Sequence, residues 1–199
     1  DVDLFRMICA VLLVATVPPA VVYWYVVHPF PAFWRKLGPT VSLTILFTGL
    51  GLAIVGLFLV RNRLIGRDLG TNWILFAIGI GAYVVAARIG LQVRKHLTFR
   101  ILAGVPEMST EDSGTLLTEG VYAQMRHPRY ASAIIGIVGF ALIANHLGAY
   151  LVTAAFVLAM YPIIVLEERE LRERFGAQYE AYCGRVPRMS WGFGARAAP

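Results

Sequence analysis

Residues 131–166 read ASAIIGIVGFALIANHLGAYLVTAAFVLAMYPIIVL, a stretch without a single Asp, Glu, Lys or Arg. A helix needs about 20 apolar residues to cross the hydrocarbon core of a bilayer. The run 147–166 meets that length, whereas the run 131–144 is short for it. Because only Asn145 and His146 separate the two runs, the pattern predicts a tight antiparallel helical hairpin inside a membrane.

Three more apolar segments precede this hairpin, at residues 7–27, 41–60 and 73–91. The whole chain of 199 residues is 58% hydrophobic and 15% charged, whereas soluble domains are about 45–50% apolar and about 25% charged. A water-soluble chain of this composition would lack the polar residues to cover its surface. We therefore expect an all-α polytopic membrane protein, a single membrane domain over 1–199 with five transmembrane helices surrounded by membrane lipids.

The basic residues are unevenly distributed between the segments that connect these spans. Thirteen of the 18 Lys and Arg fall in three of the connecting segments, namely 29–40, 92–130 and 167–199. Since cytoplasmic loops carry an excess of basic residues, the count predicts an N-terminus outside and a cytoplasmic C-terminus. The net charge of +6 then reflects the anionic inner leaflet, and we expect no nucleic-acid partner.

The long loop 92–130 and the tail 167–199 hold the residues best suited to chemistry. In the loop, Gly120 permits a tight turn, and Pro128 keeps His127 out of a helix while starting the next one. The rings of Tyr122, His127 and Tyr130 would then converge at the membrane boundary. Such a cluster could bind a small amphipathic molecule, or it could be only an interfacial belt of aromatics, like Tyr23, Trp24 and Tyr25 at the end of the first span.

Glu167 and Glu168 form an acidic doublet directly after the last span. Carboxylates near membrane depth are costly unless a partner pairs with them. We expect Glu168 to be solvated and to pair with Arg172 one helical turn on, which leaves Glu167 as the candidate ligand.

The tail beyond the doublet is predicted to be a helix that ends near Gly184 and Pro187. Its apolar residues, Leu171, Phe175, Tyr179 and Tyr182, fall on one stripe. This helix would lie on the membrane face or pack on the loop.

Metal binding and nucleotide-loop motifs are not indicated. Cys9 and Cys183 lie far apart, and His28, His96 and His146 stand singly near span ends, so no metal is expected. The GxG triplets that start at Gly49 and Gly79 lie inside spans, which favours close helix packing.

The order of these motifs resembles that of a known superfamily. The chain reads L-x-T-x-G-V-Y-x-x-x-R-H-P-R-Y from Leu116 to Tyr130, then about 36 residues of apolar hairpin, then E-E-x-x-L-x-x-x-F-G-x-x-Y-x-x-Y-x-x-x-V-P-R from Glu167 to Arg188. This arrangement resembles the integral-membrane methyltransferases, which include isoprenylcysteine carboxyl methyltransferases and phospholipid N-methyltransferases.

The resemblance implies S-adenosylmethionine as methyl donor and a hydrophobic or lipid-like acceptor at the cytoplasmic face. The family's cofactor contacts then fall on Thr115, Leu116, Leu117, Tyr122, His127, Pro128, Arg129, Tyr130 and Glu167, with Glu107 added by ungapped offset. No dedicated catalytic acid or base is implied. In the isoprenylcysteine branch an Arg stands four residues before the equivalent of Glu167; here that position is Ile163, which disfavours a prenylcysteine carboxylate and leaves O-, S- and N-methylation open.

Two other classes of function remain open at this point. The first is an NADPH-dependent membrane reductase of the sterol-reductase type, for which more spans and more cationic residues would be expected. The second is a non-enzymatic membrane scaffold or transporter, and a transporter usually shows internal repeats, which this chain lacks.

Overall fold

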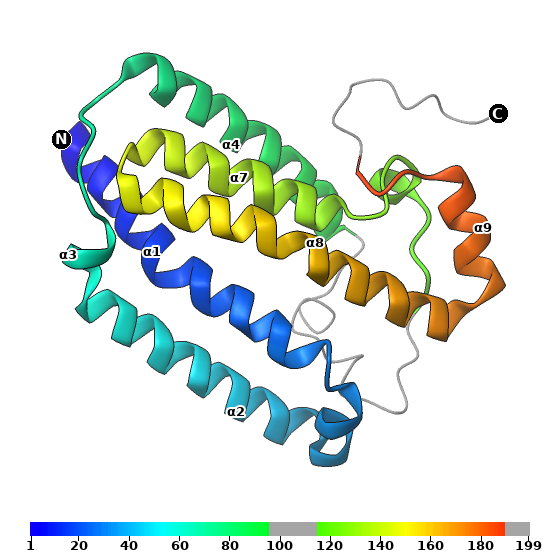
Figure 1. Ribbon diagram of the computed structural model, residues 1–199. Coiled ribbons are helices and arrows are strands. Elements are labelled where there is room, and N and C mark those ends of the chain that lie inside the picture. Colours follow the sequence, from blue (N-terminus) through cyan, green and yellow to red (C-terminus); the bar gives the residue numbers. More distant parts are fainter. Residues whose placement is uncertain (96–114, 190–199) are drawn as a thin grey trace.

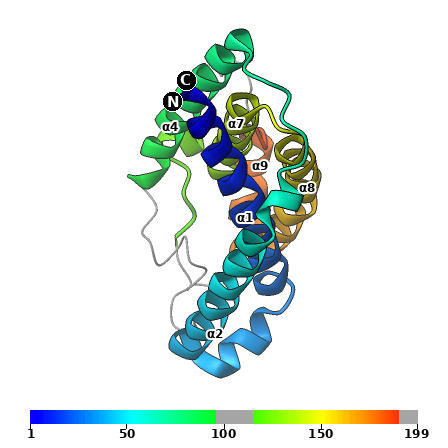
Figure 2. The ribbon, with the colours of Figure 1, turned by 90° about the vertical axis from the view of Figure 1, so that its left-hand side faces the viewer.

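The computed structural model describes residues 1–95 and 115–189, and within them the chain is all-α, as predicted. The helices are α1 (Val2–Val27), α2 (Pro31–Leu59), α3 (Arg61–Leu64), α4 (Trp73–Arg94), α7 (Pro128–Ala144), α8 (Leu147–Phe175) and α9 (Ala177–Arg185), with a short 3₁₀ helix η1 (Gly120–Ala123). The five long helices lie side by side (Figure 1), and α1 lies between α2 and α8. Figure 2 shows the same bundle from its side.

All five predicted membrane segments are helices. Four of them, α1, α2, α4 and α8, are long and apolar enough to cross a membrane, with mean hydropathies of 2.1 to 2.2. The fifth, α7, has 17 residues, or about 26 Å at 1.5 Å per residue, just under the hydrocarbon thickness of about 30 Å.

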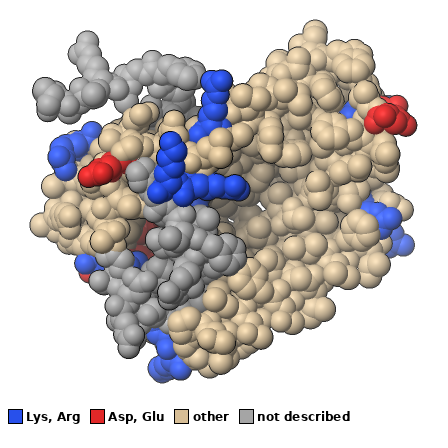
Figure 3. All heavy atoms as spheres, turned by 180° about the vertical axis from the view of Figure 1, so that it is seen from behind, with Lys and Arg blue, Asp and Glu red and all other residues tan. Residues whose placement is uncertain are grey.

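The outer faces of α2 and α4 leave large apolar side chains uncovered, such as Leu52 at 69% and Ile74 at 73% exposure. Figure 3 shows charged side chains gathered toward two ends of the molecule, with a broad uncharged surface between them. Since water would not tolerate so much exposed apolar surface, lipid is the solvent of this band.

The predicted hairpin forms between α7 and α8. Asn145 ends α7 in the left-handed conformation, with φ 48° and ψ 49°. Its side-chain amide donates to the Gly70 carbonyl at 2.8 Å, and the Tyr150 hydroxyl donates to its Oδ1 at 2.8 Å. The first bond joins the hairpin tip to the segment between α3 and α4, and the second closes the hairpin itself.

Close helix packing uses only part of the predicted glycine set. A Cβ at Gly79 of α4 would meet the Gly139 carbonyl of α7 at 2.6 Å, so these two helices approach at a distance that glycine allows. Gly49, Gly51 and Gly81 face open space. The packing interpretation is therefore confirmed for Gly79 and wrong for the other three within the bundle described.

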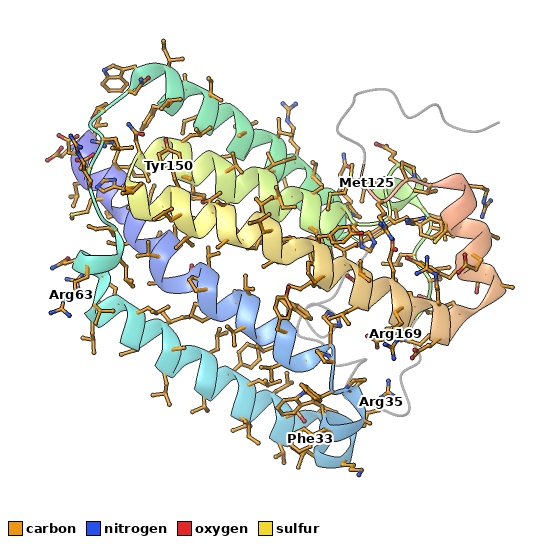
Figure 4. The ribbon with its side chains drawn as sticks, in the orientation of Figure 1. Phe33, Arg35, Arg63, Met125, Tyr150 and Arg169 are labelled. Atoms are coloured by element: carbon orange, nitrogen blue, oxygen red, sulfur yellow. The ribbon has the colours of Figure 1, made fainter. Side chains whose placement is uncertain are left out.

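The two ends of the bundle differ in what they carry. Arg63 and Tyr150 lie toward one end, whereas Arg35, Met125 and Arg169 lie toward the other (Figure 4). The second end gathers η1, the start of α7, the polar continuation of α8, and α9. It is the end at which the candidate site residues meet.

Candidate functional site

The site begins where the loop enters α7. Gly120 takes a positive φ of 61°, which a side chain would disfavour, and opens η1. Pro128 starts α7, and His127 before it is non-helical at φ −121° and ψ 55°, as the sequence predicted. This geometry turns the His127 ring inward, where the residue is 3% exposed.

His127 lies between the two carboxylates of the acidic doublet. Its Nε2 is 3.1 Å from Oε1 of Glu168, and its Nδ1 is 3.8 Å from Oε2 of Glu167. Consecutive residues of a helix point about 100° apart, so the imidazole can lie near both carboxylates only from a position between them. This restricts where α7, which begins directly after His127, can start relative to α8. The structure thus brings the histidine–proline pair and the acidic doublet together.

The expectation that Glu168 is solvated is wrong, whereas the expected ion pair with Arg172 is present at 3.9 Å. The residue is fully buried, and it accepts hydrogen bonds from Arg126 Nη2 at 2.9 Å and from Arg188 Nη2 at 2.7 Å. Arg172, its expected partner, lies at the longer distance of 3.9 Å and also donates to Glu180 at 2.7 Å. Two guanidinium groups from distant segments replace the water that solvation would have supplied.

Arg126 and Arg188 are site residues that the sequence reasoning did not assign. Both stand in the quoted motifs, but they lie 42 and 20 residues from Glu168, beyond any spacing rule within one helix. The backbone closes the same junction, since the amides of Arg126 and His127 donate to the carbonyls of Pro187 and Arg188 at 2.9 and 3.1 Å. The carboxylate holds the Arg188 guanidinium and raises its pKa, so this residue stays charged.

Glu167 has a different environment from its neighbour. Its Oε2 is buried and has no hydrogen-bond partner among the residues described. On the same side, Arg129 donates from Nη2 to the Tyr130 hydroxyl at 2.9 Å and lies 4.5 Å above the ring of Trp24. Trp24, read from sequence only as an interface residue, therefore lies beside the site.

The tail covers this region with aromatic residues. The sequence predicted one continuous helix here, but the structure has two. Gly176, at φ 49° and ψ −126°, ends α8 and lets α9 begin in a new direction. The predicted stripe stays together across the break, because Tyr179 and Tyr182 pack with Leu171 and Phe175 in one cluster. The tail helix thus packs on the loop.

The remaining predicted contacts line this loop–tail junction. Tyr122 is buried and accepts at its carbonyl from the Tyr182 hydroxyl at 2.6 Å, and burial raises the pKa of its own phenol to about 12. Leu116 joins the tail cluster, Leu117 packs with Val93, and Thr115 is exposed. Glu107 lies outside the residues described.

The chemistry available here is that of a polar ligand site. A buried carboxylate oxygen without a donor can accept from a ligand hydroxyl or pair with an ammonium group. The surrounding rings of Trp24, Tyr122 and Tyr130 suit a planar base or a cation. Among the residues described, no group of His, Cys, Asp and Glu could hold a metal ion.

Comparisons with known proteins assign this segment to a family. The profile of the phospholipid methyltransferase family matches residues 74–178, just over half of the chain. A probable protein-S-isoprenylcysteine O-methyltransferase of Oryza sativa subsp. indica is 32% identical over 133 residues, which cover 63% of this chain and 65% of the rice protein. Protein-S-isoprenylcysteine O-methyltransferase B of Arabidopsis thaliana is 38% identical over 82 residues, covering 39% of this chain and 40% of that protein.

A relative of another description matches as well. The nickel-cobalt-cadmium resistance protein NccN of Alcaligenes xylosoxydans xylosoxydans is 30% identical over 80 residues, covering 40% of this chain and 38% of that protein. No solved structure matches. This chain thus spans less than two thirds of the length of these relatives. The family profile covers nearly all of α4 and the whole of α7 and α8. The chain belongs to the phospholipid methyltransferase family of integral-membrane proteins.

Proposed function

We propose that this protein transfers a methyl group from S-adenosylmethionine to a membrane-soluble, hydrophobic acceptor at the cytoplasmic face. The observation that carries the proposal is Oε2 of Glu167, a buried acceptor without a donor, 3.8 Å from His127 Nδ1 in the segment that matches the family. A buried carboxylate oxygen without a hydrogen bond is costly, and a ligand that donates to it removes that cost.

The residues present fit such a ligand. Glu167 would accept from ribose hydroxyls or pair with the α-amino group, and His127 would donate to the methionyl carboxylate. Tyr122, Arg129 and Tyr130 would enclose the nucleoside and the sulfonium and keep water out. When bound, the donor supplies an electrophilic methyl group, so the protein's part is to align the acceptor and exclude water.

The cytoplasmic location rests on charge. The segments that carry 13 of the 18 basic residues, namely 29–40, 92–130 and 167–199, are those that flank the site end of the helices. Anionic inner leaflets attract such an excess. We therefore place the site at the inner face and the hairpin tip of Asn145 at the outer face.

The names of the relatives and the apolar residue at position 163 limit the class of acceptor. The names of the rice and Arabidopsis relatives refer to isoprenylcysteine O-methylation. In this chain Ile163 is fully buried in the core, so this position offers no charge to an acceptor. We propose a hydrophobic acceptor that reaches the site from the bilayer.

The test is binding of S-adenosylhomocysteine to the purified full chain, measured by calorimetry. We expect binding to the wild type, and a loss of affinity of about tenfold or more for Glu167→Ala and His127→Ala, the effect of removing a hydrogen bond to a charged group. Glu173→Ala is the matched control, because this α8 carboxylate is 65% exposed and pairs only on the surface with Arg169.

Two outcomes contradict the proposal. One is a wild type that does not bind S-adenosylhomocysteine, and the other is an affinity that neither site variant changes. NADPH is titrated in parallel, and saturable binding of NADPH alone would favour a reductase instead.

A further inference from the structure

The end of α1 carries a pair of stacked rings beside the candidate site. The rings of Trp24 and His28 have centroids 5.1 Å apart and planes inclined by 22°. The two residues are one helical turn apart, and the His28 amide donates to the Trp24 carbonyl at 3.0 Å, so both side chains project from the same side of α1. The His28 side chain is only 2% exposed. The stack is therefore part of the protein interior and more than an aromatic belt at the membrane interface.

The guanidinium of Arg129 lies against the Trp24 ring. Its Cζ is 4.5 Å from the ring centroid of Trp24 and 4.8 Å from that of Tyr130. A cation within about 6 Å of an aromatic centroid is attracted by the negative face of the ring, and tryptophan attracts it most strongly. Two rings from different helices, α1 and α7, therefore hold one guanidinium group.

Arg129 connects this arrangement to the candidate site. Its charge acts on Glu167, the carboxylate whose Oε2 is buried without a hydrogen-bond partner among the residues described. An arginine side chain has several rotatable bonds, and fixing them for a ligand costs conformational entropy. A guanidinium that is already held by two rings does not bear this cost again when a ligand binds.

Contacts with α8 fix the end of α1 that carries Trp24. The Nδ1 atom of His28 lies 3.5 Å from Oε2 of Glu170, whose side chain is 14% exposed. On the same part of α1, the Tyr25 hydroxyl donates to the Ala159 carbonyl at 2.9 Å. These two contacts join α1 to α8 on either side of the Trp24 ring along the helix. They therefore determine where the ring stands relative to the site.

We propose that Trp24 is a positioning residue of the ligand site: its ring holds the Arg129 guanidinium in the place where the ligand meets it. The inference rests on the proposed binding of S-adenosylmethionine and adds a residue of α1 to the site. This helix precedes residues 74–178, the segment that matches the family profile. Trp24 acts here through Arg129, while His28 and Glu170 keep the ring in position.

The test is a double-mutant cycle between Trp24 and Arg129, read by calorimetry of S-adenosylhomocysteine binding to the purified full chain. Trp24→Leu keeps an apolar side chain but removes the ring, and it should lower the affinity about tenfold, the size expected for one cation–π contact that is partly shielded from water. Trp24→Phe keeps a ring with a weaker negative face and should lower the affinity only about threefold. In an Arg129→Gln background Trp24→Leu should lower the affinity no further, because glutamine carries no charge for the ring to hold.

A second tryptophan near the end of α1 provides the matched control. Trp34 is buried, and its Nε1 donates to the Val26 carbonyl at 2.9 Å. Trp34→Leu should therefore lower stability without lowering the affinity for S-adenosylhomocysteine. The same cycle is also measured by chemical denaturation without ligand. There, the decrease in folding equilibrium constant caused by Trp24→Leu should be about tenfold smaller when Arg129 is already glutamine.

Equal losses of affinity from Trp24→Leu and Trp34→Leu, or a loss from Trp24→Leu that persists in the Arg129→Gln background, would overturn the inference. If Arg129→Gln binds too weakly to measure, the denaturation cycle decides. The wild type separates the two proposals. If it binds S-adenosylhomocysteine while Trp24 and Arg129 are not coupled, only this inference fails. If the two residues are coupled in denaturation but the wild type does not bind, the methyl-transfer function fails and the placement of Arg129 by Trp24 remains.

Discussion

Both ends of the bundle contain a buried ion-pair network, and the two networks have opposite composition. At the end that carries the hairpin tip the buried group is a cation: Arg6, 2% exposed, bonds to Asp3 at 2.9 Å and also to Asp68 and Thr71. At the site end the buried group is an anion, Glu168, held by Arg126 and Arg188.

The two networks differ in whether a buried carboxylate oxygen of the described residues remains without a hydrogen-bond donor. Asp3 and Asp68 are 75% and 52% exposed, so water completes their solvation and the network mainly ties α1 to the segment before α4. At the site end a second carboxylate, Glu167, has a buried oxygen without a donor, and the guanidinium charge exceeds that of Glu168. A buried ion pair alone therefore does not mark a binding site; the buried acceptor beside it that lacks a hydrogen bond does.

The largest expected effect is that of Glu168→Ala. It would leave the Arg126 guanidinium, 10% exposed, without its carboxylate and facing the half-exposed Arg188, which costs about 3–5 kcal/mol of unfolding free energy. Chemical denaturation in detergent measures this loss, and limited proteolysis should show the tail beyond Gly176 released first. A loss no larger than that of the surface variant Glu173→Ala would contradict the role given to this carboxylate.

Arg6→Met tests the network at the hairpin-tip end and should cost less, about 1–3 kcal/mol of unfolding free energy. The reason is that Asp3 and Asp68 remain largely hydrated when their partner is removed. Binding of S-adenosylhomocysteine should be unchanged, because the network lies at the opposite end of the helices. A weakened affinity for S-adenosylhomocysteine would show that the two ends are coupled and that the Arg6 network is not purely structural.

The site end should also lose stability at alkaline pH. Burial raises the pKa of the Tyr122 phenol to about 12 and raises those of Tyr179 and Tyr182 as well. Their contribution is fully present below pH 10, the ordinary pKa, and is lost as the pH rises toward the folded-state values, since only the unfolded chain then ionises. For Tyr122 the loss at pH 11 is about 1.4 kcal/mol.

Tail proteolysis between pH 9 and pH 12 measures this effect, with Tyr122→Phe as the comparison. Tyr122→Phe should reduce the slope of the loss, because phenylalanine cannot ionise. An unchanged slope would show that Tyr122 is accessible to water in the folded state.

Sequence reasoning placed the spans and the hairpin because length, hydropathy and the Asn145-His146 break are local properties. It also placed His127, because the restriction by Pro128 acts on the residue directly before it. It missed Arg126 and Arg188 as partners of Glu168, since that pairing depends on how three segments meet. The break at Gly176 was missed because the apolar stripe continues through it, although a glycine that can take a positive φ is a common local signal for the end of a helix.

The smallest effect expected is that of Tyr182→Phe, which removes the hydroxyl that bonds to the Tyr122 carbonyl at 2.6 Å. The loss of one neutral hydrogen bond costs about 1 kcal/mol. Tyr150→Phe is the matched control, since it removes a similar bond to Asn145 at the hairpin tip. If the tail encloses the ligand, Tyr182→Phe should also speed dissociation of S-adenosylhomocysteine by a few fold, whereas Tyr150→Phe should not. The contradicting result is that the two variants lose equal stability and release S-adenosylhomocysteine at equal rates. A purely structural hydrogen bond has the same consequence at either end, so this result would mean that α9 anchors the loop without covering the site.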